Sequence, residues 1–437
     1  MKIIIVGASH GGVEAVDALV EGKEYDQIDW FEKSDIATTS GWNPNKAAEY
    51  ISDLEKQGVK IHEHAEVISL NAENKQIEVL EVDQNKQYNF DKLILGQGSN
   101  PVELPIPGND LAGVEYLRQR SDTNKLRQSA QNDDVKNVVV VGAGYIGMMA
   151  VDLFSSVGKH VTLVDLIKRP LGTYLDTEMT DRLGKVMDER HVEVALGQQV
   201  STFEGDGHVE RVITDKSSFD ADLVIVSVGT RPNTQWLNNQ LELTPNGSLK
   251  VNEFMQTSNP DIFAIGDLVP VSYTPSNSEL NIALGSNARR TARTAVRNLF
   301  EQHAPLMAVQ GSSGLDILGY NFASAGLNTT SAAKMNIPVS SVYVEQAVSM
   351  RSEMVKPDLT VQFKLFYNPK TLEVVGGQIM SQDNQTANIN ALSIAIYKHV
   401  TIMELAEMDF FFQPDLTNVW NVMNVAGRKA MKQENIK

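Results

Sequence analysis

The chain contains one pattern twice: an apolar strand that runs into a glycine-rich loop and then a helix. Residues 2–6, Lys-Ile-Ile-Ile-Val, lead into Gly7, and residues 137–141, Asn-Val-Val-Val-Val, lead into Gly142. Short β-branched runs that end at a glycine-dense turn predict a buried strand followed by a helix. The first N–H groups of such a helix lack partners and the helix dipole adds partial positive charge, so the loop suits a phosphate. The repeat predicts two nucleotide-binding units in one chain.

The second copy has the complete motif G-x-G-x-x-G, formed by Gly142, Gly144 and Gly147. The next predicted strand, residues 160–164, ends on Asp165. This order is typical of a dinucleotide-binding βαβ unit. Asp165 would accept hydrogen bonds from a ribose 2′-hydroxyl and repel a 2′-phosphate, which favours NADH over NADPH. The neighbouring Lys168 and Arg169 weaken that preference.

The first copy departs from the motif, because Ser9 stands where the second glycine would be. Its glycines are Gly7, Gly11 and Gly12, and His10 lies among them. Alone, this loop also fits an ordinary strand-to-helix turn. However, a second apolar run, residues 27–31, ends on Glu32, about 20 residues further on, where an acid would hold an adenosine ribose.

Three later loops also end predicted strands. Gly98 lies in residues 96–101, Gly-Gln-Gly-Ser-Asn-Pro, and Gly229 ends the apolar run that begins at residue 223. The strand at residues 262–265 ends on Gly266 and Asp267. Doubly wound sheets place ligands at such carboxyl ends. From the residues alone, Asp267 either faces a ligand or caps the next helix.

The remaining pattern predicts a helix over 46–57 with Gly58 as its C-terminal cap, then strands over 59–70, 76–82 and 87–95. The sequence pattern changes from about residue 302 onward. In this C-terminal part, a hairpin predicted over 361–367 and 373–380 precedes a helix predicted over 386–399. Three phenylalanines follow at 410–412, and Trp420 lies shortly after. This aromatic segment predicts either local core packing or a subunit interface, and we favour the interface.

Composition limits the classes of partner and chemistry. The formal net charge is −17, which argues against nucleic acid and anionic membrane surfaces. No apolar run is long enough to cross a bilayer, so we expect a cytoplasmic protein. There is no cysteine, which excludes disulfides and thiolate catalysis, and the eight histidines lack metal-binding spacing, so we expect no metal.

Together these features resemble the FAD-dependent pyridine nucleotide-disulfide oxidoreductases, in particular their NADH peroxidase and NADH oxidase branch. Within that branch, residues 169–233 look more similar to NADH peroxidase than to NADH oxidase. The segments that carry the resemblance are residues 7–12, 145–147, 169–172, 204–207, 229–233, 260–267, 310–315 and 410–414. The resemblance implies an α/β fold with two Rossmann-like nucleotide-binding domains, for FAD and NAD, and a C-terminal α+β dimerisation domain. The implied FAD domain, 1–107 and 245–301, is interrupted by an NAD domain, 108–244, and followed by an interface domain, 302–437, that makes a homodimer or a dimer of dimers.

The resemblance also implies site roles. The first loop, with Glu32 and the adjacent Lys33, holds the adenine half of FAD. Gly266 and Asp267 reach its ribityl and pyrophosphate region, while the second loop and Asp165 hold NADH. Tyr145 is similar to the aromatic residue that gates the nicotinamide pocket. An arginine of residues 281–293, with Arg289 preferred, would bring positive charge close to His10.

One departure from this family is large. Its members carry a redox cysteine in a Ser-Cys-Gly turn, and the corresponding segment here, residues 36–44, is shorter and contains none. One register places Trp42 at the cysteine position and another places Ser40 there; neither side chain forms a reversible sulfenate. The leading hypothesis is therefore an NADH oxidoreductase that works through FAD alone, with oxygen or peroxide as acceptor and hydrogen peroxide as the product from oxygen, aided by His10 and Arg289. The alternatives are an FAD- and NADH-binding regulatory relative that has lost turnover, and a shortened form of a peroxidase.

Overall fold

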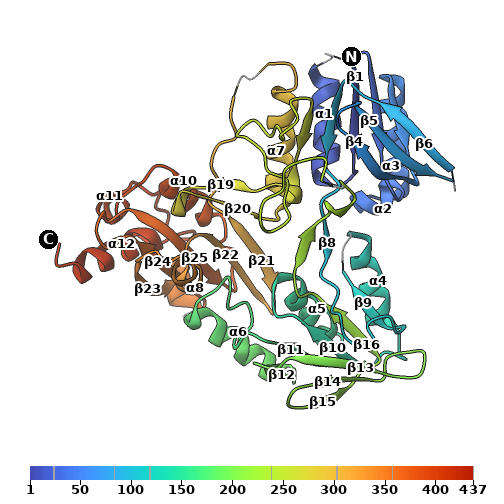
Figure 1. Cartoon of the computed structure of the whole chain (residues 1–437). Helices are drawn as coiled ribbons and strands as arrows, with labels where there is room; N and C mark the ends of the chain where they lie inside the picture. Colours follow the sequence, from blue (N-terminus) through green and yellow to red (C-terminus); the bar gives the residue numbers. More distant parts are fainter. Residues whose placement is uncertain are drawn as a thin grey trace.

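The computed structural model describes residues 1–22, 25–82, 84–117, 120–237, 239–301, 304–356 and 358–436. The chain forms three lobes, two of which carry a parallel sheet and one an antiparallel sheet (Figure 1). The predicted α/β class with a C-terminal α+β lobe is confirmed. The predicted domain boundaries stay predictions, and the one at residue 302 lies outside the described residues.

The first lobe is built on a parallel sheet of order β18-β7-β1-β2-β3. Its strands are β1 (Lys2–Val6), β2 (Gln27–Phe31), β3 (Val59–His62), β7 (Lys92–Leu95) and β18 (Ile262–Ala264). Helices α1 (His10–Gly22) and α7 (Gly285–Arg297) pack side by side against it, as Figure 1 shows. The other elements are α2 (Ile36–Ser40), α3 (Pro44–Lys56), the antiparallel β4 (Ala65–Asn71), β5 (Gln76–Glu81) and β6 (Gln84–Asn89), the pair β19 (Val271–Tyr273) and β20 (Ser278–Leu280), and short 3-10 turns at Gln235–Leu237, Gly266–Leu268 and Thr274–Ser276.

The second lobe repeats this design with the sheet order β12-β11-β10-β16-β9. Its strands are β9 (Val114–Tyr116), β10 (Asn137–Val141), β11 (His160–Asp165), β12 (Glu193–Leu196) and β16 (Leu223–Val226). Its helices are α4 (Arg120–Gln131), α5 (Tyr145–Ser156) and α6 (Thr177–Glu189), and a small antiparallel sheet contains β13 (Val200–Glu204), β14 (Arg211–Thr214) and β15 (Ser218–Asp220). Every residue of the central strand β10 after Asn137 is buried, which explains its uninterrupted valines.

Two antiparallel strands connect the nucleotide lobes. They are β8 (Ser99–Pro101) and β17 (Thr230–Pro232), and Asn100 pairs with Arg231 at their centre. The chain therefore leaves the first lobe and returns to it along one ribbon.

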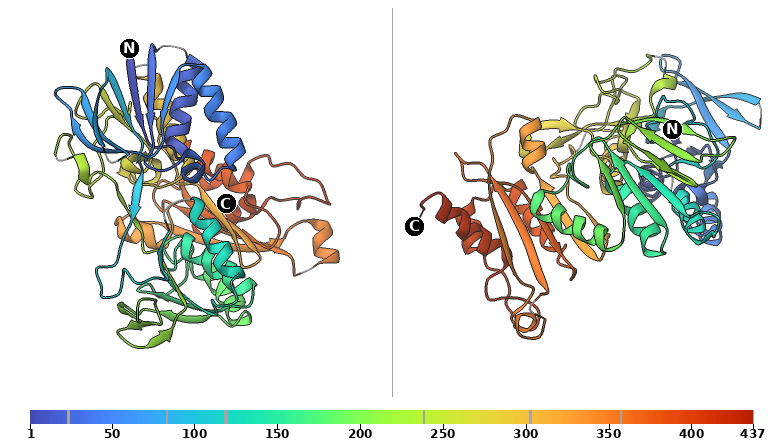
Figure 2. Two further views of the ribbon diagram at one scale, coloured as in Figure 1. Left: turned by 90° about the vertical axis from the view of Figure 1, so that its right-hand side faces the viewer. Right: turned by 90° about the horizontal axis from the view of Figure 1, so that it is seen from below.

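The third lobe contains an antiparallel sheet of order β21-β22-β25-β24-β23. Its strands are β21 (Ser313–Ile317), β22 (Tyr320–Gly326), β23 (Ser340–Ala347), β24 (Thr360–Tyr367) and β25 (Val374–Ser381). Its helices are α8 (Thr329–Lys334), α9 (Met350–Val355), α10 (Asn388–Tyr397), α11 (Ile402–Glu407) and α12 (Val422–Gln433). Seen from below, the C-terminal helices lie at the opposite end of the molecule from the first lobe (Figure 2).

The two faces of the antiparallel sheet pack against different partners. One face packs on α10 and α12, with Phe363 and Leu392 in a common core. On the other face, Phe322 and Met380 join the core of the second lobe together with Met148 of α5. The sheet is therefore anchored to the second lobe.

Some sequence-based boundaries were wrong. The strand predicted over 59–70 is two strands, because His64 adopts a left-handed φ of 54° at a turn between β3 and β4. The strand predicted over 87–95 is broken between β6 and β7. Helix α3 begins at Pro44 rather than residue 46, because Asn43 caps it, whereas Gly58 follows it with the predicted positive φ of 87°. None of the described helices is long and apolar enough to cross a membrane.

Candidate functional site

The two glycine loops have the same geometry. A Cβ on Gly12 would lie 1.8 Å from the Gly7 carbonyl oxygen, and one on Gly147 would lie 1.7 Å from that of Gly142. Gly7 and Gly142 also adopt φ values of 100° and 115°, which disfavour other residues. The glycines thus let α1 and α5 begin directly against the preceding strand, with their first N–H groups at the loop.

Each loop is tied to the acid at the end of the neighbouring strand. Glu32 Oε2 accepts a hydrogen bond from Ala8 N at 2.7 Å, and Asp165 Oδ2 accepts one from Ala143 N at 2.5 Å. The second oxygen of Glu32 accepts from Ser34 N at 3.0 Å. Since a carboxylate has about four lone-pair positions, both acids keep capacity for ribose hydroxyls.

A cavity of about 310 Å³ opens beyond the first loop, and we call it the FAD cavity. Its lining brings together seven predicted site residues: Gly7, Ser9, His10, Glu32, Lys33, Gly98 and Asp267. Gly11, Gly12 and Gly266 are not in this lining. Gly11 faces Ile265 and Gly12 faces the Gly7 carbonyl, while Gly266 N donates to Thr291 Oγ1 at 2.9 Å, so these glycines pack the helices behind the cavity.

His10 and Asp267 lie on the same side of this cavity. Ser99 Oγ donates to Asp267 Oδ2 at 2.9 Å, and burial raises the pKa of Asp267 despite the opposing effects of Ser99 and His10. The ring of His10 also touches Gly285, since a Cβ there would lie 2.8 Å from His10 Cδ2. Asp267 does not cap α7, whose N-cap is Leu284. The ligand-facing interpretation of Asp267 is therefore the one that the geometry favours.

Arg289 lies one turn along α7 and its charge is paired away from the loop. Its Nη1 donates to Glu14 Oε2 at 2.8 Å, and Arg293 contacts the other oxygen of the same carboxylate. Glu14 is buried on α1, so the two arginines hold α7 against α1. The role predicted for Arg289 beside His10 stays a prediction, because its bonds are to Glu14.

Ser40 and Trp42, the two candidates for the cysteine position, are not among the described residues that line the FAD cavity. Ser40 Oγ lies at the end of α2 against Ala37 O, and the Trp42 ring packs edge-on against Tyr50 with ring centres 4.9 Å apart. The residue of this segment that lines the cavity is Thr39. Its position could not be read from the sequence, because it depends on the rotation of a five-residue helix.

The residues present fit FAD. Thr39 Oγ1 and Gln97 Oε1 are buried without a partner among the described residues, and both residues line the FAD cavity. Backbone donors at the start of α1, acidic Glu32 and these unsatisfied oxygens match a pyrophosphate with hydroxyl-rich arms. Other lining residues that the sequence did not single out are Ala65, Glu66, Val67 and Trp236, whereas Asn233 belongs to the segment 229–233 that carries the resemblance.

Gly144 on the second loop and Gly229, which follows β16, border open space. A Cβ on Gly144 would meet only Tyr174, at 4.0 Å, and one on Gly229 would meet nothing within 4 Å. Such space beside the start of α5 allows a pyrophosphate to approach the backbone closely.

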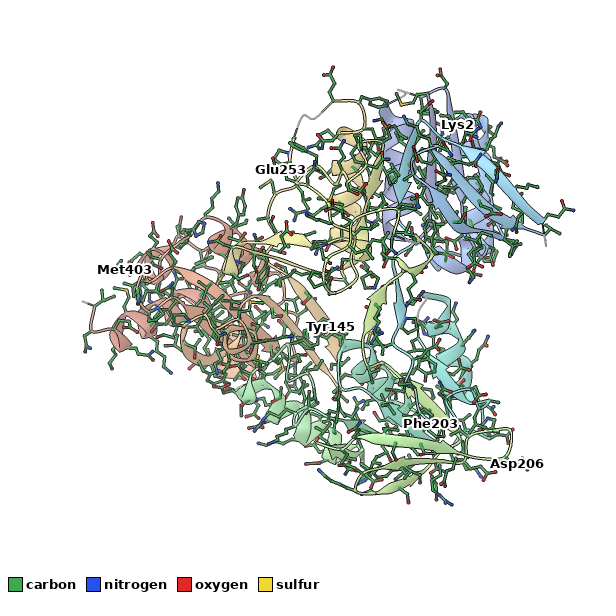
Figure 3. The ribbon with its side chains drawn as sticks, viewed as in Figure 1. Lys2, Tyr145, Phe203, Asp206, Glu253 and Met403 are labelled. Atoms are coloured by element: carbon green, nitrogen blue, oxygen red, sulfur yellow. The ribbon has the colours of Figure 1, made fainter. Side chains whose placement is uncertain are left out.

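A second cavity, of about 380 Å³, lies where the three lobes meet, and we call it the three-lobe cavity. Its lining includes Tyr145 and Tyr174 from the second lobe, Leu284 from the first, and Ser313 and Gln378 from the third. Tyr145 is labelled in Figure 3, beside β21. Leu284 precedes Gly285, which touches His10 of the FAD cavity, so this short segment links the linings of the two cavities.

Tyr145 is held on several sides. Its ring stacks on Tyr174 with centres 4.1 Å apart, and its hydroxyl shares a 2.8 Å hydrogen bond with Ser313. Burial raises the pKa of Tyr145, and hydrogen bonds with Ser313 and Ser324 oppose that rise. The hydroxyl therefore stays protonated near neutral pH.

Residues 1–297 match the family model described as pyridine nucleotide-disulphide oxidoreductase, and residues 317–423 match its dimerisation domain. The chain belongs to this family. The family predicted from the sequence is thereby confirmed, and with it an oxidoreductase that carries FAD and a pyridine nucleotide.

Relatives cover the whole chain. An NADH oxidase of Enterococcus faecalis is 36% identical and the match covers 99% of this chain and 100% of the relative. An NADH oxidase of Streptococcus pneumoniae is 32% identical with the same coverage. Among solved structures, a water-forming NADH oxidase from Lactobacillus brevis, bound to NADH, superimposes with a TM-score of 0.93 at 28% identity, covering 100% of this chain and 99% of that one.

Gly142 and Gly144 of the second loop have different roles, one in packing and one in ligand binding, and mutation can separate them. Gly144→Ala should leave the melting temperature within about 3 °C, since its φ of −83° suits alanine. It should still weaken NADH binding about tenfold or more by blocking the approach of the pyrophosphate. Gly142→Ala should instead lower the melting temperature, because its Cβ would lie 2.4 Å from Ser227 O at a φ of 115°. Calorimetric melting and NADH titration check both variants, and wild-type NADH affinity in Gly144→Ala would contradict the assignment.

Proposed function

We propose that this NADH-dependent flavoprotein oxidoreductase is an NADH oxidase that works through FAD alone. It would pass a hydride from NADH to FAD and two electrons on to oxygen, in the balance NADH + H⁺ + O₂ → NAD⁺ + H₂O₂. The observation that carries the proposal is the presence of two intact nucleotide loops in a chain with no cysteine.

The residues of the FAD cavity would bind and orient this cofactor. Glu32 and the start of α1 suit its adenosine and pyrophosphate, and Asp267 with Ser99 suits its ribityl chain. FAD, when bound, supplies a two-electron carrier that accepts hydride and reduces oxygen. The protein's part is to bring a nicotinamide ring to the cavity side near His10 and Leu284.

The proposed product follows from counting electrons. Water formation needs four electrons for each O₂, twice what one NADH delivers. In the family pattern a cysteine adds a second redox centre, and here the segment contributes Thr39 to the FAD cavity instead. A hydroxyl cannot be reversibly oxidised in this way, so two-electron reduction to peroxide is the supported outcome.

We assign to His10 the stabilisation of negative charge that develops on oxygen. Its ring lines the FAD cavity at the start of α1, where the helix dipole also favours an anion. Arg289, the other candidate for this role, is paired with Glu14. We further propose a cytoplasmic location, where NADH is available.

A catalytically impaired regulatory protein is the second candidate. It is favoured by the shortened segment of residues 36–44, from which only Thr39, among the described residues, lines the FAD cavity. A shorter segment beside this cavity would cover the cofactor less completely.

Anaerobic addition of NADH to the FAD-loaded protein should bleach the flavin absorbance, with one NADH consumed per FAD. Readmission of air should restore the absorbance and release about one H₂O₂ per NADH, measured with a peroxidase-coupled dye. Catalase should halve the oxygen consumed, because it returns half an O₂ for each H₂O₂. Two NADH oxidised per O₂ without peroxide would contradict the proposed product. A flavin that binds but stays oxidised under excess NADH would favour the regulatory candidate.

Coenzyme choice should depend on Asp165. Asp165→Asn keeps an oxygen that can accept from Ala143 N but removes the negative charge that would repel a 2′-phosphate. We expect kcat/KM for NADPH to rise about tenfold and that for NADH to fall a few-fold. Steady-state rates with both coenzymes check this, and Asp152→Asn, which alters a carboxylate paired with Arg190, is the matched control. An unchanged ratio of the two rates would contradict the role.

The dimer should be formed through the aromatic segment. Phe410 packs partly against the third lobe's core, while Phe411 and Phe412 are 70% and 45% exposed and Leu416, Val419 and Trp420 are exposed beside them. Phe411→Ser with Phe412→Ser should halve the mass in sedimentation because it removes apolar contact area. Val82→Ser, also at an exposed apolar residue, should not change the mass. A double variant that stays dimeric would place the interface elsewhere.

A further inference from the structure

One row of polar side chains crosses four strands of the third lobe's sheet. Ser313 of β21 pairs with Ser324 of β22, Ser324 pairs with Gln378 of β25, and Gln378 pairs with Lys364 of β24. Residues directly opposite each other in antiparallel strands project from the same face. These four residues, which we call the polar row, therefore all face the second lobe.

The polar row contacts both Tyr145 and Tyr174, which we call the tyrosine pair. Ser313 shares its hydrogen bond with the Tyr145 hydroxyl. Gln378, which is 1% exposed, donates from Nε2 to the Tyr174 carbonyl oxygen at 3.0 Å and accepts from Asp176 N at 3.0 Å. Lys364 Nζ lies 2.9 Å from Asp176 Oδ2 and 2.8 Å from Glu178 Oε1.

The loop that carries Tyr174 is held on one side by the third lobe. The carbonyl oxygens of Gly172, Thr173 and Tyr174 each accept a hydrogen bond from a third-lobe side chain, those of Thr330, Asn328 and Gln378. At its other end, Leu171 N donates to Ala143 O within the glycine loop, at 2.8 Å. The orientation of Tyr174 is therefore coupled to the third lobe on one side and to the nucleotide loop on the other.

The tyrosine pair lies on the route between the two nucleotide sites. Tyr145 is the first residue of α5, directly after the glycine loop, and its ring lines the three-lobe cavity opposite Leu284. If NADH binds at the second loop, as the proposed function requires, its nicotinamide would pass through this cavity to reach the side near His10. The stacked rings of Tyr145 and Tyr174 occupy that path.

We propose that the polar row is a latch that holds Tyr145 and Tyr174 across this route, so that the third lobe sets how readily a nicotinamide ring reaches the FAD cavity. The inference rests on the proposed function, because it assumes that NADH enters from the second loop. Ser313 and Gln378 are positioning residues in this scheme. Ser313 bonds directly to the Tyr145 hydroxyl, and this bond must be broken before the Tyr145 ring moves aside. Gln378 bonds to the Tyr174 carbonyl oxygen and so fixes the loop from which the Tyr174 ring projects.

The latch predicts a selective gain in affinity when it is weakened. Ser313→Ala and Gln378→Leu should each tighten binding of NAD⁺ to the oxidised holoenzyme about three- to tenfold, since the closed state loses one or more hydrogen bonds. Binding of ADP-ribose, which lacks the nicotinamide ring, should change less than twofold. Isothermal titration calorimetry measures both ligands without turnover. In rapid mixing with NADH, the apparent Kd for flavin reduction should fall while the limiting rate stays the same.

Two further variants separate a latch from a general structural role. Ser313→Thr retains a hydroxyl and should restore wild-type affinity. Arg182→Met removes a different contact between the same lobes, the 2.6 Å pair of Arg182 with Glu345, without touching the Tyr174 loop, and should leave both ligands unaffected. Ser313→Ala provides the test if Gln378→Leu does not fold.

The outcomes are distinct. Unchanged or weaker NAD⁺ binding in Ser313→Ala, or equal tightening of NAD⁺ and ADP-ribose, would overturn the latch while leaving the proposed function intact. A wild-type holoenzyme that binds neither ligand would overturn the proposed function, and the latch with it.

Discussion

The close approach of a helix to the strand before it is the constraint on which both nucleotide sites depend. At Gly12 and Gly147 a side chain would overlap the carbonyl oxygen of the first glycine of the loop, so only a bare backbone lets the helix begin there. This packing directs the first N–H groups of α1 and α5 towards the loop, and Glu32 and Asp165 then fix each loop through one backbone hydrogen bond. The anion-binding character of the sites is thus a property of the backbone, and the side chains around it select the rest of the ligand.

The other consequence of this packing is the position of His10. As the first residue of α1, it is carried to the edge of the FAD cavity, against Gly285 at the start of α7. Helix α7 is in turn held to α1 by the two arginines on Glu14. Leaving the buried Glu14 carboxylate without these partners would destabilise the protein, so α7 must stay within reach of it. The ion-pair cluster therefore fixes the spacing of the two helices more than it adds to the free energy of folding. That spacing places Gly285 of α7 against His10 of α1.

The sequence predicted the features that depend on neighbouring residues. Both glycine loops, their terminal acids, the hairpin of β24 and β25 and the family follow from local pattern. It did not predict features that depend on rotation or on distant pairing. Thr39 rather than Ser40 or Trp42 lines the FAD cavity because of the orientation of α2, and Arg289 meets Glu14 because two helices 275 positions apart pack together. The polar row could not be predicted for the same reason, since the register of four strands alone places Ser313 and Lys364 in one row.

Two neighbouring rows of side chains on the same sheet form the contact between the second and third lobes. Leu315, Phe322 and Met380 form an apolar row, which packs into the core of the second lobe and supplies the favourable burial. The polar row beside it stabilises the contact between the lobes less, because burying the charges that it brings together carries a large desolvation penalty. Burial alone would lower the pKa of Lys364, but Glu178 and Asp176 raise it above its ordinary value, so the ammonium stays charged between two carboxylates. Such a group tolerates few geometries. The apolar row therefore holds the lobes together, whereas the polar row determines the one arrangement in which Tyr174 stacks on Tyr145.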